Sequence, residues 1–154
     1  MPQLDSIYAL LKFEEGCRYQ LYDDANGQLI VPGYHVIGHP TIGIGRRLDQ
    51  SQALTDPEVN VLVFDDINKW YGALTEFTWF RALDPVRRWA IVSMAHTMGV
   101  AGVEKFSDMI AALTKEDWPA AHDAVMNSKW ADEAKARATR VSEMLVTGAW
   151  PTVD

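Results

Sequence analysis

Cysteine is almost absent from this sequence of 154 residues, because Cys17 is the only one. A single cysteine cannot form a disulfide within the chain, so we expect folding to need no oxidising compartment. Long apolar runs are also missing, and no stretch approaches the roughly 20 residues that span a bilayer. Residues 1–6 hold no basic cluster, and Lys12, Glu14 and Glu15 interrupt the apolar run that follows. We therefore expect no signal peptide, and synthesis in the cytoplasm.

Basic residues are in short supply as well. The sequence has 14 lysines and arginines against 21 aspartates and glutamates, which gives a formal net charge of −7. A negative chain is not attracted in general to the phosphates of nucleic acids or to anionic membrane surfaces. We expect neither nucleic acid nor a stable membrane association among its partners.

The apolar content of 48% in 154 residues is sufficient to bury one core, which predicts a single domain over 1–154. The region 16–48 mixes glycine with β-branched and aromatic residues, which is typical of short strands and hairpins. A first helix ends at Glu15. From Thr55 onward the apolar residues recur at helical spacing, and the last helix ends at Gly148.

A helix, a small sheet, a long helix and a helical bundle, in this order, predict a mostly helical α+β fold with two lobes. We expect a small β-sheet lobe at about 12–54 and a helical lobe formed by 1–11 together with 75–154. A helix over 56–74 would link them. Asp84-Pro85 begins a helix with little polar surface, which predicts the buried centre of the helical lobe. Thr114 to Asp117 resembles a further helix start. A groove between two lobes is a usual place for an extended substrate.

Two carboxylates could perform glycosidic bond hydrolysis, which needs an acid for the leaving oxygen and usually a second carboxylate to activate water. Glu15 ends the first helix beside apolar neighbours that could desolvate it, and Asp24 follows nine positions later. Spacing alone does not separate them from solvated surface carboxylates, which most acidic residues are.

The order of residues around these carboxylates is more specific. Glu15-Gly16, Tyr22-Asp23-Asp24, Gly27 and Thr41-Ile42-Gly43-Ile44-Gly45 resemble the active-site signature of phage lysozymes. The resemblance continues in later segments, which are Asp84–Arg88, Met98–Val103 with Phe106, Asp117-Trp118, Lys129-Trp130 and Arg137–Val141 through Thr147-Gly148.

The resemblance implies a lysozyme-like fold and a cofactor-free muramidase, which hydrolyses the bond between N-acetylmuramic acid and N-acetylglucosamine with inversion. Carried over, Glu15 is the general acid, and Asp24 and Thr41 hold the attacking water. Gly43 belongs to the same signature. Arg137 matches the family arginine that pairs with the catalytic glutamate. The alternative is that Arg137 is exposed on a helix and has no such role.

Several positions depart from the family pattern. The segment from Ala25 to Pro40 is longer than in the best-known members and resembles an extra β-hairpin, which either extends the sugar-binding wall or is a surface elaboration. Arg46 replaces a common histidine, and Arg46 and Arg47 could face the anionic stem peptides of peptidoglycan. His96 stands where many family members have a phenylalanine in the substrate groove. It either contacts the sugar or is a buried histidine whose ring nitrogens are hydrogen-bonded within the protein.

Other residues predict no further site. His35 and His39 lie in a segment rich in glycine and proline without a Glu or Cys at ligand spacing, so we expect no metal. The tryptophans are expected to pack in the core. They are Trp70, Trp79, Trp89, Trp118, Trp130 and Trp150.

Three functions remain open at this stage. The leading one is a monomeric endolysin that waits in the host cytoplasm and reaches the periplasmic wall after release, and carriage in a particle is an alternative route. A lytic transglycosylase would break the same bond and close the sugar into an anhydro ring. A non-catalytic wall-binding phage component would need none of this chemistry, which the presence of Glu15, Asp24, Thr41 and Arg137 disfavours.

Overall fold

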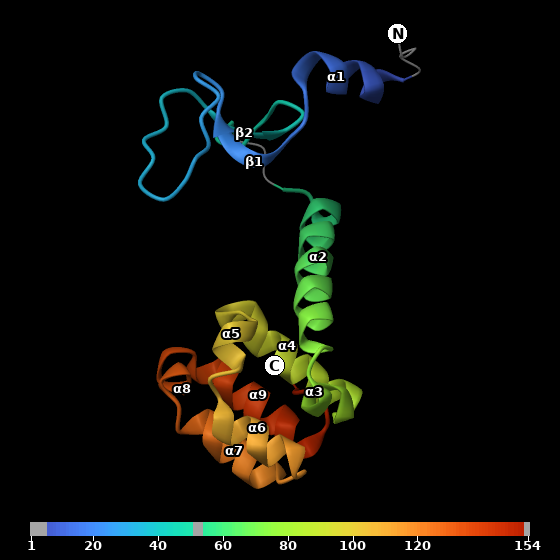
Figure 1. The fold of residues 1–154 in the computed structure, drawn as a ribbon, viewed down its shortest axis with the longest axis vertical. Coiled ribbons are helices and arrows are strands. Elements are labelled where there is room, and N and C mark those ends of the chain that lie inside the picture. Colours follow the sequence, from blue (N-terminus) through green and yellow to red (C-terminus); the bar gives the residue numbers. More distant parts are fainter. Residues whose placement is uncertain (1–5, 51–53, 153–154) are drawn as a thin grey trace. The chain divides into compact units, whose positions relative to one another are not determined.

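The computed structural model describes residues 6–50 and 54–152. The chain divides into two compact units, Met1–Thr55 and Asp56–Asp154 (Figure 1). Among the described residues, the first unit holds one helix and a small sheet, and the second holds helices and no strand. Each unit is described by itself below, and the expected association of 1–11 with the helical lobe stays a prediction. The mostly helical α+β class expected from the sequence is confirmed.

Helix α1 (Ile7–Glu15) opens the first unit and has a defined start and end. The Ser6 hydroxyl accepts the Ala9 N–H at 3.1 Å and caps the first turn. The helix ends at Gly16, whose φ of 72° is a conformation that a residue with a Cβ adopts only at a cost. Glu15 therefore stands in the last turn of α1, as predicted.

A three-stranded antiparallel sheet follows, in the order β1-β2-β3. Its strands are β1 (Arg18–Asp23), β2 (Pro40–Gly43) and β3 (Arg46–Arg47). Tyr22 lies opposite Thr41, and Ile42 lies opposite Arg46. A tight turn joins β2 to β3, and it contains Gly43 at φ 66° and Gly45 at φ 71°. The expected small sheet is confirmed.

The extra hairpin expected within residues 25–40 is wrong. This segment, which the structure describes throughout, contains no strand before β2 and makes one isolated bridge, between Leu29 and Tyr22 of β1. The backbone N–H of Tyr34 donates to the carbonyl oxygen of Val31 at 2.9 Å in a turn, and its hydroxyl donates to Asp23 at the end of β1 at 3.1 Å. The segment is a long loop that turns back on β1.

The second unit consists of helices, which are α2 (Asp56–Leu74), α3 (Thr78–Ala82), α4 (Pro85–Met98), α5 (Val100–Val103), α6 (Ser107–Thr114), α7 (Trp118–Met126), α8 (Lys129–Glu133) and α9 (Lys135–Thr147). Helix α4 is central, since it contacts α2, α5 and α9. The largest fully buried apolar side chains come from several of these helices, namely Leu74, Phe80, Ile91, Met94, Met109 and Leu145. The predicted central helix after Asp84-Pro85 is confirmed.

The helix ends in this unit follow local signals. Asp84 accepts the N–H groups of Val86 and Arg87 at 3.0 and 3.1 Å and begins α4. Desolvation by burial would raise the pKa of Asp84, but hydrogen bonds from the Arg87 side chain and backbone lower it below its ordinary value. Asp117 caps α7. Gly148, at φ 64°, ends α9.

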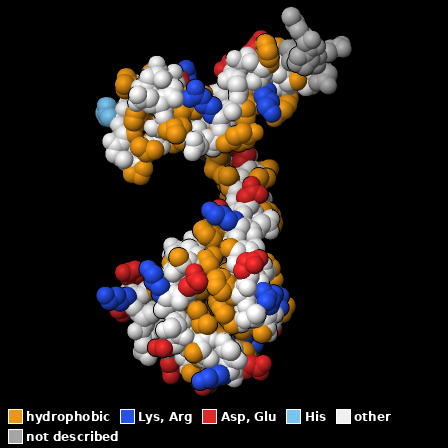
Figure 2. All heavy atoms as spheres, in the orientation of Figure 1, with side chains coloured by type: hydrophobic (Ala, Val, Ile, Leu, Met, Phe, Trp, Pro, Cys, Tyr) orange, Lys and Arg blue, Asp and Glu red, His pale blue; other side chains and the backbone are white. Residues whose placement is uncertain are grey.

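Apolar side chains reach the surface of both units (Figure 2). On α1, Ile7 and Phe13 are 70% and 73% exposed. On α2, Leu74 is buried in the core, whereas Val59, Leu62 and Val63 in its N-terminal half are exposed. No helix within the described ranges 6–50 and 54–152 is long and apolar enough to cross a bilayer.

The tryptophans pack as expected with one exception. Trp130 is buried, and Trp70, Trp79, Trp89 and Trp118 pack partly buried against the core. Trp150 follows the last helix and is 63% exposed. The core prediction is therefore wrong for Trp150, which lines an open pocket beside α4 and α9 together with Trp89 and Met144.

Candidate functional site

Glu15 lies against the turn between β2 and β3. A methyl group added to Gly45 in this turn would stand 3.1 Å from Oε2 of Glu15. The Glu15 side chain is exposed, and so is that of Phe13. Within the first unit, Phe13 therefore does not desolvate Glu15 as expected. An exposed carboxyl beside a tight turn is accessible to a substrate.

Asp24 follows β1 and is held on both carboxylate oxygens. Its Oδ1 accepts the N–H of His39 at 2.8 Å, and its Oδ2 lies 2.9 Å from Nη2 of Arg47. Its backbone N–H donates to the carbonyl oxygen of His39 at 3.1 Å. A carboxylate has about four lone-pair positions, so Asp24 retains acceptor capacity for a further partner.

Thr41 lies on β2 opposite Tyr22 and Arg47. Its hydroxyl donates to the carbonyl oxygen of His39 at 3.0 Å. The side chain is 2% exposed. Because its proton is used on His39, the oxygen faces any further partner as an acceptor. The backbone of His39 thus brings Asp24 and Thr41 together.

The remaining predicted residues of the first unit lie on the same hairpin. Arg47 forms the ion pair with Asp24, with its side chain 46% exposed. Arg46 is half-buried on β3 opposite Ile42. Gly43 ends β2 and starts the turn. A contact of the two arginines with stem peptides stays a prediction, and the structure gives Arg47 a different partner.

Arg137 and His96 belong to the helical unit. Nη1 of Arg137 on α9 donates to the hydroxyl of Thr97 on α4. His96 precedes Thr97 near the end of α4. His96 is exposed, which excludes its reading as a buried histidine. The pairing of Arg137 with Glu15 joins residues of two units and stays a prediction.

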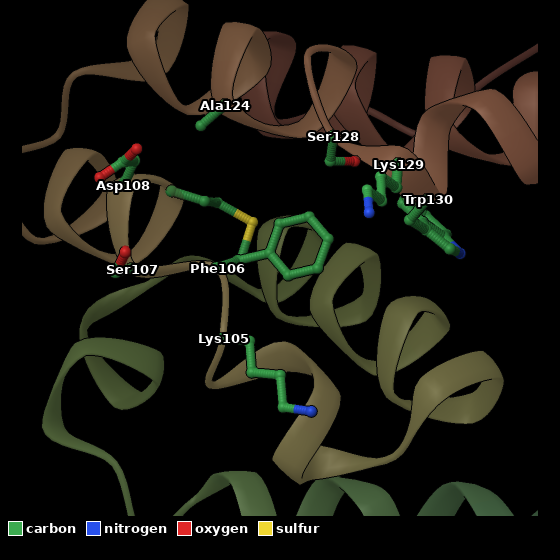
Figure 3. A pocket seen from close by; sticks show the side chains of 9 residues that line it. Lys105, Phe106, Ser107, Asp108, Ala124, Ser128, Lys129 and Trp130 are labelled. Carbon is green, nitrogen blue, oxygen red and sulfur yellow. The ribbon is translucent and has the colours of Figure 1, made fainter.

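The helical unit also has an open pocket of about 460 Å³ (Figure 3). The ring of Phe106 stands in its middle, with Lys105 on one side and Lys129 on the other. Ser107, Asp108, Met109, Ala124, Ser128 and Trp130 complete its lining. An apolar floor between two ammonium groups suits a ligand with an apolar body and a negative charge. No pattern in the sequence predicts this pocket, because its lining comes from separate segments.

The sequence also missed the part played by Asp23, which is fully buried. The hydrogen bond from the Ile37 N–H is the largest influence on the pKa of Asp23 and lowers it. Burial opposes this, but further bonds from Ala25, Gly38 and Tyr34 add to the lowering. Asp23 is therefore an ionised structural carboxylate, and Asp24 is the accessible member of the pair. The only hint of this role in the sequence is that Asp23 and Asp24 are adjacent.

Gly45→Ala should reduce activity without unfolding the protein. The methyl group would push the Glu15 carboxylate by a few tenths of an ångström, and since a misplacement of about 1 Å costs on the order of a hundredfold in rate, a smaller loss follows. The left-handed backbone adds about 1–2 kcal/mol of strain. We expect kcat/KM on the glycan substrate that the resemblance implies to fall about twofold to tenfold. Gly99→Ala is the matched control, since Gly99 has φ 72° and nothing within 4 Å. Equal effects of the two variants would contradict the prediction.

Among the residues that the structure describes, no group of three or more His, Cys, Asp or Glu side chains is arranged to hold a metal ion. The histidine considered for this purpose, His39, instead places Nδ1 at 2.8 Å from Oδ2 of Asp49.

Comparison with known proteins shows which chains this sequence is similar to. A family model described as phage lysozyme matches residues 12–146. The pre-baseplate central spike protein Gp5 of Enterobacteria phage T4 is 27% identical over 93% of this chain, which spans 28% of that protein. Probable T4-type lysozymes 1 and 2 of Dictyostelium discoideum are 25% and 24% identical over 94% of this chain, which spans 96% of each.

Proposed function

Since this chain belongs to the phage lysozyme family, and is a glycoside hydrolase, we propose that it hydrolyses the β-1,4 bond between N-acetylmuramic acid and N-acetylglucosamine in bacterial peptidoglycan. One observation carries the proposal: Asp24 and Thr41 meet at the backbone of His39, and Glu15 lies at the turn of the hairpin that contains Thr41. Hydrolysis of a glycosidic bond needs an acid, a base and a place for water.

Each residue has one task in the proposed reaction. Glu15 donates its proton to the glycosidic oxygen as the bond from that oxygen to the sugar carbon breaks. Asp24 accepts a proton from the water that attacks the same carbon on the opposite face, and the hydroxyl oxygen of Thr41 accepts the water's other hydrogen. The product is a reducing sugar of inverted configuration.

The ion pair with Arg47 and the N–H of His39 fix the orientation of the Asp24 carboxylate from two sides. Both contacts leave lone pairs on Asp24 for the water. A base held in this way is already oriented when the substrate binds, which lowers the entropy cost of the reaction.

Product analysis separates hydrolysis from the second candidate, a lytic transglycosylase. That reaction uses an acid but admits no water, so it gives Asp24 and Thr41 no water to hold. Digestion of purified peptidoglycan should release muropeptides with reducing ends, as measured by mass spectrometry. Anhydro-muramyl ends would show that the chain is a lytic transglycosylase and would refute the proposed hydrolysis.

The biological setting that we propose is that of an endolysin, which acts as a monomer and causes lysis of the host cell. The chain would accumulate in the cytoplasm and meet the periplasmic wall after a separate event opens the membrane. Cells that express it should stay intact until chloroform permeabilises the inner membrane, and should then clear within minutes, as followed by turbidity. Clearing without chloroform, or none with it, would contradict this setting.

A non-catalytic wall-binding component would bind peptidoglycan but release no muropeptides.

A further inference from the structure

The loop that joins β1 to β2 is wound around the carboxylate of Asp23. Oδ1 accepts the N–H groups of Ala25 and Gly38, both at 3.0 Å. Oδ2 accepts the N–H of Ile37 at 2.7 Å and the hydroxyl of Tyr34 at 3.1 Å. All four donors come from the loop itself. A buried charge is tolerated only when it is satisfied in this way, so the carboxylate and the loop depend on each other.

The end of this loop carries the contacts that orient Asp24 and Thr41. Ile37 and Gly38, which bond to Asp23, immediately precede His39 in the chain. His39 then donates to Asp24 at 2.8 Å and accepts from Thr41 at 3.0 Å. A shift of the two bonded amides would therefore move the backbone group that holds Asp24 and Thr41.

Gly38 shows how closely the loop approaches the site. A methyl group at this position would overlap Oδ1 of Asp24 and would lie 2.7 Å from Cβ of Ala25. The loop thus packs its backbone directly on the Asp24 carboxylate, and Asp23 holds that backbone in place through the N–H of Gly38.

We infer that Asp23 is a positioning residue for the hydrolysis, which sets the Asp24 carboxylate and the Thr41 hydroxyl through the loop and the backbone of His39. The inference rests on the proposed function, because it assigns the loop a task in that reaction. On this inference, the segment 25–38 acts by holding Asp24 and Thr41 in place. The earlier alternative was that its exposed tip binds the sugar.

Asp23→Asn tests this role in the full chain. The amide keeps the shape but loses the charge and presents an NH₂ group to backbone donors, so the loop loosens. We expect kcat on soluble muropeptide oligomers to fall about tenfold to a hundredfold, with KM within about twofold of the original. Asp84→Asn is the control, since it also removes a hydrogen-bonded carboxylate with a lowered pKa but lies in the helical unit. It should leave kcat and KM unchanged.

Tyr34→Phe covers the case in which Asp23→Asn does not fold. It removes one hydroxyl donor from Asp23 and one acceptor from the Asn26 side chain, and it keeps the ring. We expect a smaller fall in kcat, about two- to fivefold, again without a change in KM. A folded variant of either kind with unaltered kcat, or one whose KM rises while kcat is kept, would overturn the inference.

Amide hydrogen exchange separates this inference from the proposed function. The N–H of His39 should exchange about tenfold faster or more in Asp23→Asn, whereas the amides of α4 should not change. If the unsubstituted protein released no muropeptides, the proposed function would fail, and the exchange would still report whether Asp23 holds the loop. Unchanged exchange at His39 would refute the positioning role by itself.

Discussion

Glu15→Gln should abolish most of the hydrolysis of peptidoglycan while the protein folds normally. The amide has the shape of the acid but cannot donate its proton to the leaving oxygen, and loss of a general acid costs about 10²- to 10⁴-fold in rate. We expect kcat to fall by this factor and KM to change little, as measured by release of reducing ends. Circular dichroism should show an unchanged helical signal, because Glu15 is exposed at the end of α1.

Glu14→Gln is the matched control for this experiment. It removes the same charge from the neighbouring exposed position of α1, and it should retain full activity. An active Glu15→Gln variant would exclude Glu15 as the acid. Equal losses in the two variants would assign the effect to the charge of the helix end and not to proton transfer.

Phe80→Ala should give the largest loss of stability among single substitutions in the helical unit. Phe80 is fully buried, and its ring makes edge contacts with Tyr71 at 5.5 Å and with Trp79 at 6.0 Å between centroids. Removal of a buried phenylalanine ring costs about 3–5 kcal/mol, because apolar burial is lost and a cavity remains. The free energy of unfolding, measured with urea by circular dichroism, should fall by this amount.

Phe64→Ala serves as its control, since it deletes the same ring from an exposed position on α2, where 63% of the residue is accessible. Substitutions at such positions change stability by about 0.5 kcal/mol or less. A loss at Phe80 no greater than that at Phe64 would show that α3 does not contribute to the core as the structure indicates.

The parts of the fold that the sequence predicted depend on residues close together in the chain. Asp84-Pro85 begins α4, Asp117 begins α7 and Gly148 ends α9, each through contacts within one helical turn. The same locality explains why Glu15 was correctly placed at the end of α1. These signals are short, so they can be identified without knowledge of the tertiary structure.

The loop between β1 and β2 could not be predicted in this way. The bonds that define it join Asp23 to Ile37 and Asp24 to His39, over 14 and 15 positions. The β-branched residues there, Ile30-Val31 and Val36-Ile37, are typical of strands, which led to the wrong expectation of a hairpin. A buried carboxylate with four donors competes with strand pairing, and the sequence does not reveal which prevails.

The candidate site was predicted only as far as side chains indicate chemistry. Glu15, Asp24 and Thr41 were found from their order in the chain, and the structure brings Asp24 and Thr41 together at the backbone of one residue. That residue is His39, whose contribution to Asp24 and Thr41 is made by its backbone N–H and carbonyl oxygen. No sequence pattern could have indicated it.

The winding of the loop around one carboxylate has a consequence for protein engineering. The conformation of the segment 25–38 depends on hydrogen bonds to Asp23, which lies outside the segment. A graft into a homologous enzyme with a short turn would need that aspartate in the recipient, together with Tyr34 and Gly38 in the donated piece. A transplant of the tip alone would separate the loop from the charge that shapes it.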